Sequence, residues 1–512
     1  MSRAGWWILL AGIGLRVVFF LVSANAGGDA LERAALAARW VRHPVFGAVL
    51  NDAWLPLHVS LEGGLALLLG NVELASRLLS LLAGAASVWL VWKIARLLYG
   101  ETAAYLSLLV FAFYSLHIGY STTSSSEAPY LFCVLAGLDC FFNFQQTGRM
   151  KWLALSGICL TLGAAIRYES WVIIFGVGLV LFVSALGSLP DRFSRMRDLQ
   201  SLLIFGLTAG AWPAFWMAFS WLKWRNPLYQ VEATRSLVAQ TVKSFPHSPF
   251  YLLAFTPGVL FLTLSPLAFA GAFYGLWSAI RRRPGHQFVG IVAAFALVQL
   301  YQVVSGGQLA LARYSITLGT LLAVASGYGL EQIARRFSLQ SGCTFYAVVT
   351  VVLLLNLGTI LVLSESRWRF SDKFSSISPR LRFSRHIQDV GTELRRRLAP
   401  GDALAIDNYN VESNEVAEVA GLPLQTGDRV FDAALSRQDL PSDLWNFIAL
   451  KRPKYLVYSE HGVLRPILPL PSGCSATPVI RGEMEFACLF ANDIYSLYEI
   501  HYLTRGSAAA RL

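Results

Sequence analysis

Residues 5–24 read GWWILLAGIGLRVVFFLVSA, an apolar stretch whose single charged side chain is Arg16. At roughly 1.5 Å per helical residue, its length matches the roughly 30 Å of hydrocarbon in a bilayer. Arg3 is the one basic side chain before it, and Gly27-Gly28-Asp29 follows where a cleaved leader has a small-x-small site. We therefore expect a membrane-spanning helix that is retained in the mature protein.

Similar apolar blocks recur up to residue 364. The chain is 55% hydrophobic and 14% charged, with a mean hydropathy of +0.51, whereas soluble proteins carry about 25% charged residues. We expect an all-α polytopic membrane domain over residues 1–364, with two long outer loops at 25–73 and 222–256. The pattern predicts about eleven transmembrane helices, at 5–24, 74–98, 102–119, 127–144, 152–166, 170–187, 201–221, 257–279, 287–305, 315–334 and 344–364.

The block at 57–70 decides the topology. It is shorter than the other blocks, and we place it in the membrane interface rather than across the bilayer. The basic residues of the short loops then all fall on the side of Arg3, which the positive-inside rule identifies as the cytoplasm. They are Lys93, Arg96, Arg149, Lys151, Arg192, Arg195, Arg197, Arg281, Arg282, Arg283, Arg335 and Arg336. The net charge of +11 is spread over these loops instead of forming a stripe, which argues against a nucleic-acid partner.

Residues 365–512 lack long apolar runs, and we expect them to form a soluble α/β domain outside the cytoplasm. Residues 384–398 resemble a helix, and the apolar runs at 402–406, 455–458 and 486–489 resemble short strands. Cys474 and Cys488 follow the last apolar block, so an oxidising compartment would pair them in a disulfide. The alternative is a buried free thiol at Cys488 and an exposed one at Cys474.

Two acidic residues stand at the outer ends of apolar blocks. Asp29 precedes the run Ala30 to Ala37, as the N-cap of a helix would, and Glu127 opens the fourth block with Pro129 in its first turn. Capping alone explains both positions. The functional alternative is that Asp29 is a general base for a hydroxyl acceptor and that Glu127 belongs to the same site.

In the predicted topology, further candidate residues, most of them basic or aromatic, lie on the outer side of the membrane. Arg77 lies just inside the second block, where it would either snorkel to lipid headgroups or bind a phosphate through its guanidinium group. Arg167 with Glu169 forms either a surface pair or part of a site, and Arg313 with Tyr314 forms either an interfacial anchor or a phosphate contact. The remaining candidates on this side are Glu32 and His58.

These features, in this order, resemble the membrane-embedded polyprenyl-phosphate-sugar glycosyltransferases of the GT-C class, which include protein O-mannosyltransferases and lipid A aminoarabinose transferases. Members carry an Asp early in the first outer loop, a Pro-Leu start of a juxtamembrane helix, and an alanine-small-arginine-leucine start of the second span with a basic inner end. The corresponding segments here are Asp29, Pro56-Leu57, Ala75-Ser76-Arg77-Leu78 and Lys93 to Gly100. The resemblance covers residues 5–335 and is strongest up to 187.

The resemblance implies transfer of one sugar from a polyprenyl-phosphate donor to a hydroxyl of a lipid, glycan or protein acceptor, with inversion, at the outer leaflet of the bacterial inner membrane. Asp29 would take the acceptor proton and Glu127 would orient the acceptor or the sugar. Donor-phosphate and substrate contacts would come from Arg77, Arg167, Arg313, Tyr314, Glu32, His58 and Glu169. Many members have Asp-Glu where this chain has Asp29-Ala30, so a divalent metal stays open and no cofactor is assigned.

Two other functions remain open on the sequence alone. A lipid or polysaccharide transporter or flippase would place ionisable groups inside the spans, where Arg16 and Asp139 lie without an evident partner. A scaffold that merely displays residues 365–512 would tolerate any replacement of Asp29. The clustering of charged groups at one face favours the transferase. The sequence has no zinc-ligand spacing, Walker or Rossmann loop, or Gly-x-Ser-x-Gly elbow.

Overall fold

The structure is a computed structural model, and it describes most of the chain. The described residues are 1–26, 29–42, 44, 54–187, 192–229, 232–233, 235, 248–281, 285–337, 343–365, 376–399, 401–407, 412–422, 452–459, 462, 464–465, 467–471, 473–475 and 477–503. Gly27, Gly28, parts of both predicted outer loops, and Arg282 and Arg283 lie outside these ranges.

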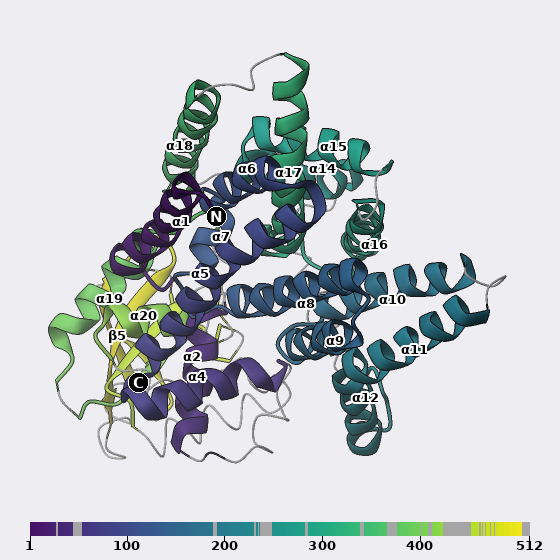
Figure 1. Cartoon of the computed structure of the whole chain (residues 1–512). Helices are drawn as coiled ribbons and strands as arrows, with labels where there is room; N and C mark the ends of the chain where they lie inside the picture. Colours follow the sequence, from purple (N-terminus) through teal and green to yellow (C-terminus); the bar gives the residue numbers. More distant parts are fainter. Residues whose placement is uncertain are drawn as a thin grey trace.

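The N-terminal part is a helical bundle, as expected (Figure 1). Its helices are α1 (Arg3–Val22), α2 (Ala30–Arg42), α4 (Pro56–Leu69), α5 (Val72–Tyr99), α6 (Glu101–Ala112), α7 (Ser115–Tyr120), α8 (Glu127–Thr147), α9 (Met150–Ala164), α10 (Glu169–Gly187), α11 (Arg192–Ala209), α12 (Ala211–Trp224), α14 (Pro249–Leu264), α15 (Pro266–Ala279), α16 (Gly285–Val304), η1 (Ala312–Ser315), α17 (Ile316–Arg336) and α18 (Cys343–Glu365).

Six of the described helices are long and apolar enough to cross a membrane: α1, α5, α8, α10, α16 and α18. Two bent pairs raise this number to 8 if each pair is one span, since α11 and α12 meet at 52° and α14 and α15 at 112°. The apolar helices α4, α6 and α9 are shorter. The chain is therefore a multi-pass membrane protein, but the expected number of eleven spans is not confirmed.

Local chemistry explains two of the interruptions. Ser265 has a φ of 80° and caps α15 by accepting a hydrogen bond from the Ala268 amide, while Pro266 cannot continue the preceding helix. The predicted span 102–119 is divided into α6 and α7 near Tyr114. Apolarity alone does not reveal such breaks, because the residues on both sides remain hydrophobic.

Arg16 forms hydrogen bonds to the backbone at the break between α6 and α7. Its guanidinium group is fully buried and donates to the carbonyl oxygens of Phe111 at 3.2 Å and Ala112 at 3.3 Å, where the helix ends. It also lies 2.9 Å from Nδ1 of His117. A broken helix leaves carbonyl groups without intrahelical donors, and inside a membrane those groups need another partner. Arg16 supplies it.

The C-terminal part is a small α/β domain, as expected. Its elements are α19 (Arg385–Arg397), β1 (Leu404–Ile406), α20 (Ser413–Val419), β2 (Tyr455–Ser459), β3 (Val479–Arg481), β4 (Met484–Ala491) and β5 (Tyr495–Tyr502). The strand order is β1-β2-β5-β4-β3, with β1 and β2 parallel and the other neighbours antiparallel. All three predicted strands and the predicted helix are present.

Alternation along the strands separates two cores. Leu404, Ile406 and Val457 pack with α19 and α20 on one face of the sheet. Ala405 and Leu456 face the opposite side, where they join the cluster that includes Leu464, Leu468 and Leu470. A period of two places successive side chains on opposite faces, so each strand contributes to both cores.

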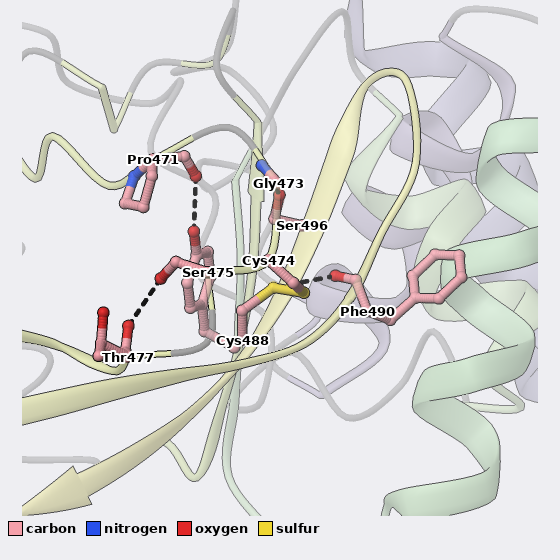
Figure 2. The surroundings of a disulfide bond; sticks show 9 residues. Pro471, Gly473, Cys474, Ser475, Thr477, Cys488, Phe490 and Ser496 are labelled. Atoms are coloured by element: carbon pink, nitrogen blue, oxygen red, sulfur yellow. Dashed lines mark hydrogen bonds between the residues drawn. A yellow bond between two sulfur atoms is a disulfide. The ribbon is translucent and has the colours of Figure 1, made fainter.

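Cys474 and Cys488 form the predicted disulfide, with their Cα atoms 5.1 Å apart (Figure 2). The bond joins the loop before β3 to strand β4. Cross-linking a loop of about 15 residues stabilises a fold by roughly 3 kcal/mol on the chain-entropy estimate. The bridge thus fastens the loop to the sheet.

The α/β domain lies against the helical bundle, next to α1 and α2 (Figure 1). The Ala24 amide donates to the carbonyl of Arg380 at 2.9 Å, and the Ser115 hydroxyl donates to the carbonyl of Ile377 at 2.8 Å. Ile377 is itself part of the apolar core of the bundle. The segment before α19 is therefore packed into the membrane domain rather than hanging from α18.

Candidate active site

The candidate site is built from residues at the starts of helices. Asp29 directly precedes α2, and its carbonyl accepts a hydrogen bond from the Arg33 amide at 2.9 Å. Glu127 is the first residue of α8 and Glu169 the first of α10. Carboxylates are favourable at helix N-termini because of the helix dipole. The capping roles expected for these acids are thus compatible with a shared site.

Asp29 is paired with Arg313. Nη1 of Arg313 lies 2.8 Å from Oδ2 of Asp29, and the two residues are 284 positions apart in the sequence. Arg313 stands in η1, directly before α17, and its guanidinium group lies over the ring of Tyr314 at 5.2 Å from the centroid. The Tyr314 carbonyl accepts a hydrogen bond from Gln299 on α16. These contacts hold η1 in place beside α2.

Arg167 occupies the centre of the cluster. Its Nη1 donates to Glu127 at 2.7 Å and to the Ser126 hydroxyl at 3.1 Å, while its Nη2 donates to Glu169 at 2.6 Å. The same guanidinium group lies 5.9 Å from the ring centroid of Tyr314. Tyr314 is therefore shared by Arg167 and Arg313. It links the Glu127 pair to the Asp29 pair.

Arg33 extends the cluster from α2. It is 5% exposed, and its guanidinium group lies over the ring of Trp54, 4.6 Å from the centroid. Its Nη1 has no hydrogen-bond partner among the described residues. The charges of Asp29 and Glu127 both act on it. Arg33 thus offers a buried hydrogen-bond donor that the described part of the chain does not use.

His58 and Glu62 both lie on α4, one helical turn apart. Both side chains are fully buried, and Nδ1 of His58 is 3.4 Å from Oε2 of Glu62. Burial, together with the charges of Arg33 and Arg167, holds the pKa of His58 well below its usual range. Burial raises the pKa of Glu62 to about 8, although Arg33 and Ser76 oppose the rise. At neutral pH both side chains are uncharged, so their contact is not an ion pair.

Opposite charges set the ionisation of the other groups. Burial alone would raise the pKa of Asp29, but the charges of Arg313 and Arg33 outweigh it and hold that pKa below its usual value. Burial lowers the pKa of Arg313 and of Arg167, and the neighbouring carboxylates more than reverse this, so both pKa values are raised. Asp29, Arg167 and Arg313 are therefore charged at neutral pH.

Two predicted site residues make contacts away from the Asp29–Arg313 pair. Arg77 donates from Nε to the carbonyl of Thr122 and from Nη2 to the carbonyls of Phe20 and Ser23, at 2.6 to 3.0 Å. It braces the C-terminal end of α1 against the loop before α8. Glu32 lies on α2 but contacts Arg39 at 3.6 Å and Asn414 of the α/β domain. The phosphate role of Arg77 and the substrate role of Glu32 stay predictions.

Sequence reasoning missed Arg33, Glu62 and Asn414 as candidate residues. Signals existed for the first two: Arg33 follows Asp29 by one helical turn, and Glu62 is an acid within an apolar block. Asn414 carried no signal, because its contact depends on how the α/β domain docks. Among the described residues, no group of three or more His, Cys, Asp or Glu side chains is arranged to hold a metal ion.

Comparisons with known proteins bear on the fold of the chain. Residues 56–208 match the model of the family described as dolichyl-phosphate-mannose-protein mannosyltransferase. The fold matches ArnT from Cupriavidus metallidurans bound to undecaprenyl phosphate, at 14% identity, with a TM-score of 0.60 and coverage of 97% of this chain and 98% of that chain. The expected GT-C-like fold is confirmed.

Two further solved structures are similar to the chain. The apo structure of the same ArnT matches at 15% identity with a TM-score of 0.59, covering 97% of this chain and 98% of that chain. The oligosaccharyltransferase AglB from Archaeoglobus fulgidus matches at 12% identity with a TM-score of 0.49, covering 90% of this chain and 70% of that chain. At these identities the solved structures establish the fold alone. No curated protein sequence matches the chain significantly.

Glu62→Gln tests the buried neutral carboxyl group. Because the folded-state pKa of Glu62 is raised from 4.5 to about 8, its contribution to stability is present at low pH and is lost as the pH rises through about 8. Gln cannot ionise, so the variant should gain stability relative to the wild type between pH 6 and pH 9, on the order of 2 kcal/mol. Thermal unfolding in detergent at both pH values measures this gain. If the difference in stability between Glu62→Gln and the wild type were the same at both pH values, the raised pKa of Glu62 would be contradicted.

Proposed function

We propose that the protein transfers one sugar, with inversion, from a polyprenyl-phosphate donor to an acceptor hydroxyl at the outer face of the membrane. The observation that carries this proposal is the cluster in which Asp29 is paired with Arg313, while Arg33, on the helix that follows Asp29, keeps a buried Nη1 without a partner among the described residues. A base beside two guanidinium groups suits a reaction that deprotonates a hydroxyl and releases a phosphate. The shared fold with ArnT, whose structure holds undecaprenyl phosphate, supports the donor class.

The reaction balances with these residues. The acceptor oxygen attacks the anomeric carbon, and the bond from that carbon to the phosphate oxygen breaks, with the electron pair leaving on the polyprenyl phosphate. Asp29, which is ionised, takes the acceptor proton. Arg33 and Arg313 compensate the charge that develops on the phosphate. Glu127, held by Arg167 at 2.7 Å, orients the acceptor or the sugar.

The hydrogen bonds that each arginine already makes indicate which side chains are available to bind the phosphate. Nε and Nη2 of Arg77 already donate to three carbonyls, and Arg167 already bonds to two carboxylates. Arg33 has a free Nη1 among the described contacts. We therefore assign the phosphate to Arg33 and Arg313 ahead of Arg77 and Arg167.

We further propose the division of the chain at residues 364/365, with the N-terminus cytoplasmic, the α/β domain extracytoplasmic, and the bacterial inner membrane as the location. The Cys474–Cys488 bond supports an oxidising compartment for that domain. The expected partners are the donor lipid, a lipid, glycan or protein acceptor, and the surrounding membrane lipids.

The transporter alternative loses its support. Arg16 and Asp139 suggested it because each stood inside a span without an evident partner. Arg16 now bonds to carbonyl groups at the break between α6 and α7, and Asp139 accepts a bond from Lys93 at 2.6 Å. Both contacts are structural, so neither residue calls for a transport pathway.

Asp29→Asn tests the reaction, because it preserves the shape of the side chain and removes its basicity. We expect turnover to fall by roughly 10²- to 10⁴-fold. The assay incubates purified protein with a panel of undecaprenyl-phosphate monosaccharides and measures the release of undecaprenyl phosphate. Asp389→Asn, on the exposed side of α19, is the matched control and should retain wild-type turnover. Near-normal turnover by folded Asp29→Asn would remove Asp29 from the mechanism.

Cysteine labelling tests the topology. A cysteine in place of Arg385, which is 95% exposed in the α/β domain, should react with an impermeant thiol reagent in intact cells. A cysteine in place of the exposed Arg149, between α8 and α9, should react only after the membrane is opened. The reverse pattern would place the α/β domain in the cytoplasm and overturn the proposed orientation.

A further inference from the structure

Helix α20 of the α/β domain contacts α2, the helix that directly follows Asp29. Nδ2 of Asn414 donates to Oε2 of Glu32 at 2.5 Å, although 382 positions separate the two residues. Glu32 is 8% exposed, and its Oε1 lies 3.6 Å from Nη2 of Arg39. A hydrogen bond to an ionised carboxylate is among the stronger kinds. This contact therefore joins the two domains beside the candidate site.

A displacement of Glu32 is transmitted directly to Asp29. Glu32 lies three residues after Asp29, and the bond from the Arg33 amide to the Asp29 carbonyl ties Asp29 to the first turn of α2. Helix α2 packs on α4 through small side chains, and the ring of Trp40 lies where a Cβ at Gly63 would be. Rotation of α2 would thus move the Asp29 carboxylate relative to Arg313.

A second contact comes from the same face of α20. Glu418 follows Asn414 by four residues, so both side chains lie on one side of the helix. The Glu418 carboxyl group interacts electrostatically with Glu73, at the start of α5, and with Arg77. Helix α20 therefore reaches both α2 and the outer end of α5.

Helix α20 is firmly held by its own domain. Val416, Ala417 and Ala420 belong to the core formed with α19 and the sheet. Directly before the helix, Glu412 accepts hydrogen bonds from the Tyr495 hydroxyl at 2.7 Å and lies 3.1 Å from Nε2 of His386. A helix anchored in this way transmits the position of the α/β domain to whatever it contacts.

We propose that the α/β domain positions the catalytic base: Asn414, acting through Glu32 and α2, holds Asp29 against Arg313, and Glu418 fastens the same helix to α5. Asn414 is a positioning residue and does not touch the reacting atoms. This inference rests on the proposed function for the role of Asp29, but the docking itself does not. It gives the α/β domain a part in catalysis.

The Glu418 contact makes the docking depend on pH. Burial, together with the Glu73 carboxyl group, raises the pKa of Glu418 to about 7, and Arg77 partly opposes this rise. Between about pH 4.5 and 7, the Glu418 carboxyl group is therefore protonated in the docked state and ionised in the undocked state. Docking is strongest below this range and weakens as the pH rises through it, because two ionised carboxylates repel each other.

Asn414→Ala in the full chain tests the proposal by amide hydrogen exchange and by turnover. Peptides covering residues 29–42 should exchange several-fold faster in this variant, since α2 has lost its tether. Turnover with the undecaprenyl-phosphate donors should fall roughly tenfold, while KM for the donor stays within twofold. The matched control is Arg385→Ala, an exposed residue of the same domain, which should change neither quantity.

A double-mutant cycle separates positioning from general damage. Asn414→Ala combined with Glu32→Gln should be no slower than the slower single variant, because both remove one contact. Additive losses, unchanged exchange in α2, or an equal effect of Arg385→Ala would each overturn the proposal. The exchange comparison needs no substrate. If the wild type released undecaprenyl phosphate from no donor, the proposed function would fail, while faster α2 exchange in Asn414→Ala would still establish the docking.

Glu418→Gln provides the independent check on the second contact. Gln does not titrate, so the melting temperature of this variant relative to the wild type should rise as the pH goes from 5 to 8. The control Arg385→Ala should show no such trend. If the melting temperature of Glu418→Gln relative to the wild type did not change with pH, Glu418 would have no part in the docking contact.

Discussion

Buried charge has to be compensated, and this constraint governs the region around Asp29. Three arginines, Arg33, Arg167 and Arg313, meet three carboxylates, Asp29, Glu127 and Glu169, at the starts of helices. Removing one partner of a buried ion pair typically costs roughly 3 to 5 kcal/mol, because the other charge is left unpaired. The cluster therefore fixes how α2, α8, α10 and η1 meet. The carboxyl group of Glu62 satisfies the same constraint by staying protonated.

The same constraint explains the ionisable residues inside the bundle. Arg16 compensates the carbonyl groups at the break in a helix, and Lys93 compensates Asp139. Both contacts stabilise the packing of helices that the membrane alone would not order, since lipid is as apolar as the helix surfaces. Arg33 differs from both residues because it lies on α2, outside the candidate spans, and its Nη1 has no hydrogen-bond partner among the described residues.

The sequence revealed much of this because its strongest signals are local. Apolar blocks, short alternating strands and an odd acid or arginine at a helix end can be read one segment at a time, and they predicted Asp29, Glu127, Arg167, Glu169 and Arg313, which the structure brings together. The Cys474–Cys488 bridge followed from the position of the cysteines after the last apolar block. The features that the sequence did not reveal depend on geometry. The bend at Ser265 lies within an apolar run, the carbonyls that engage Arg77 belong to other segments, and the contact of Asn414 with Glu32 exists only because two domains dock.

The central claim is that the donor phosphate binds to the buried arginines beside Asp29. A cryo-EM structure of the protein in lipid nanodiscs with undecaprenyl phosphate tests it most directly. We expect the phosphate oxygens within hydrogen-bond distance of Arg33 and Arg313, with the Asp29 carboxylate facing the space where the sugar would lie. A phosphate bound at Arg77 alone, or near Lys93 at the other end of α5, would contradict the account.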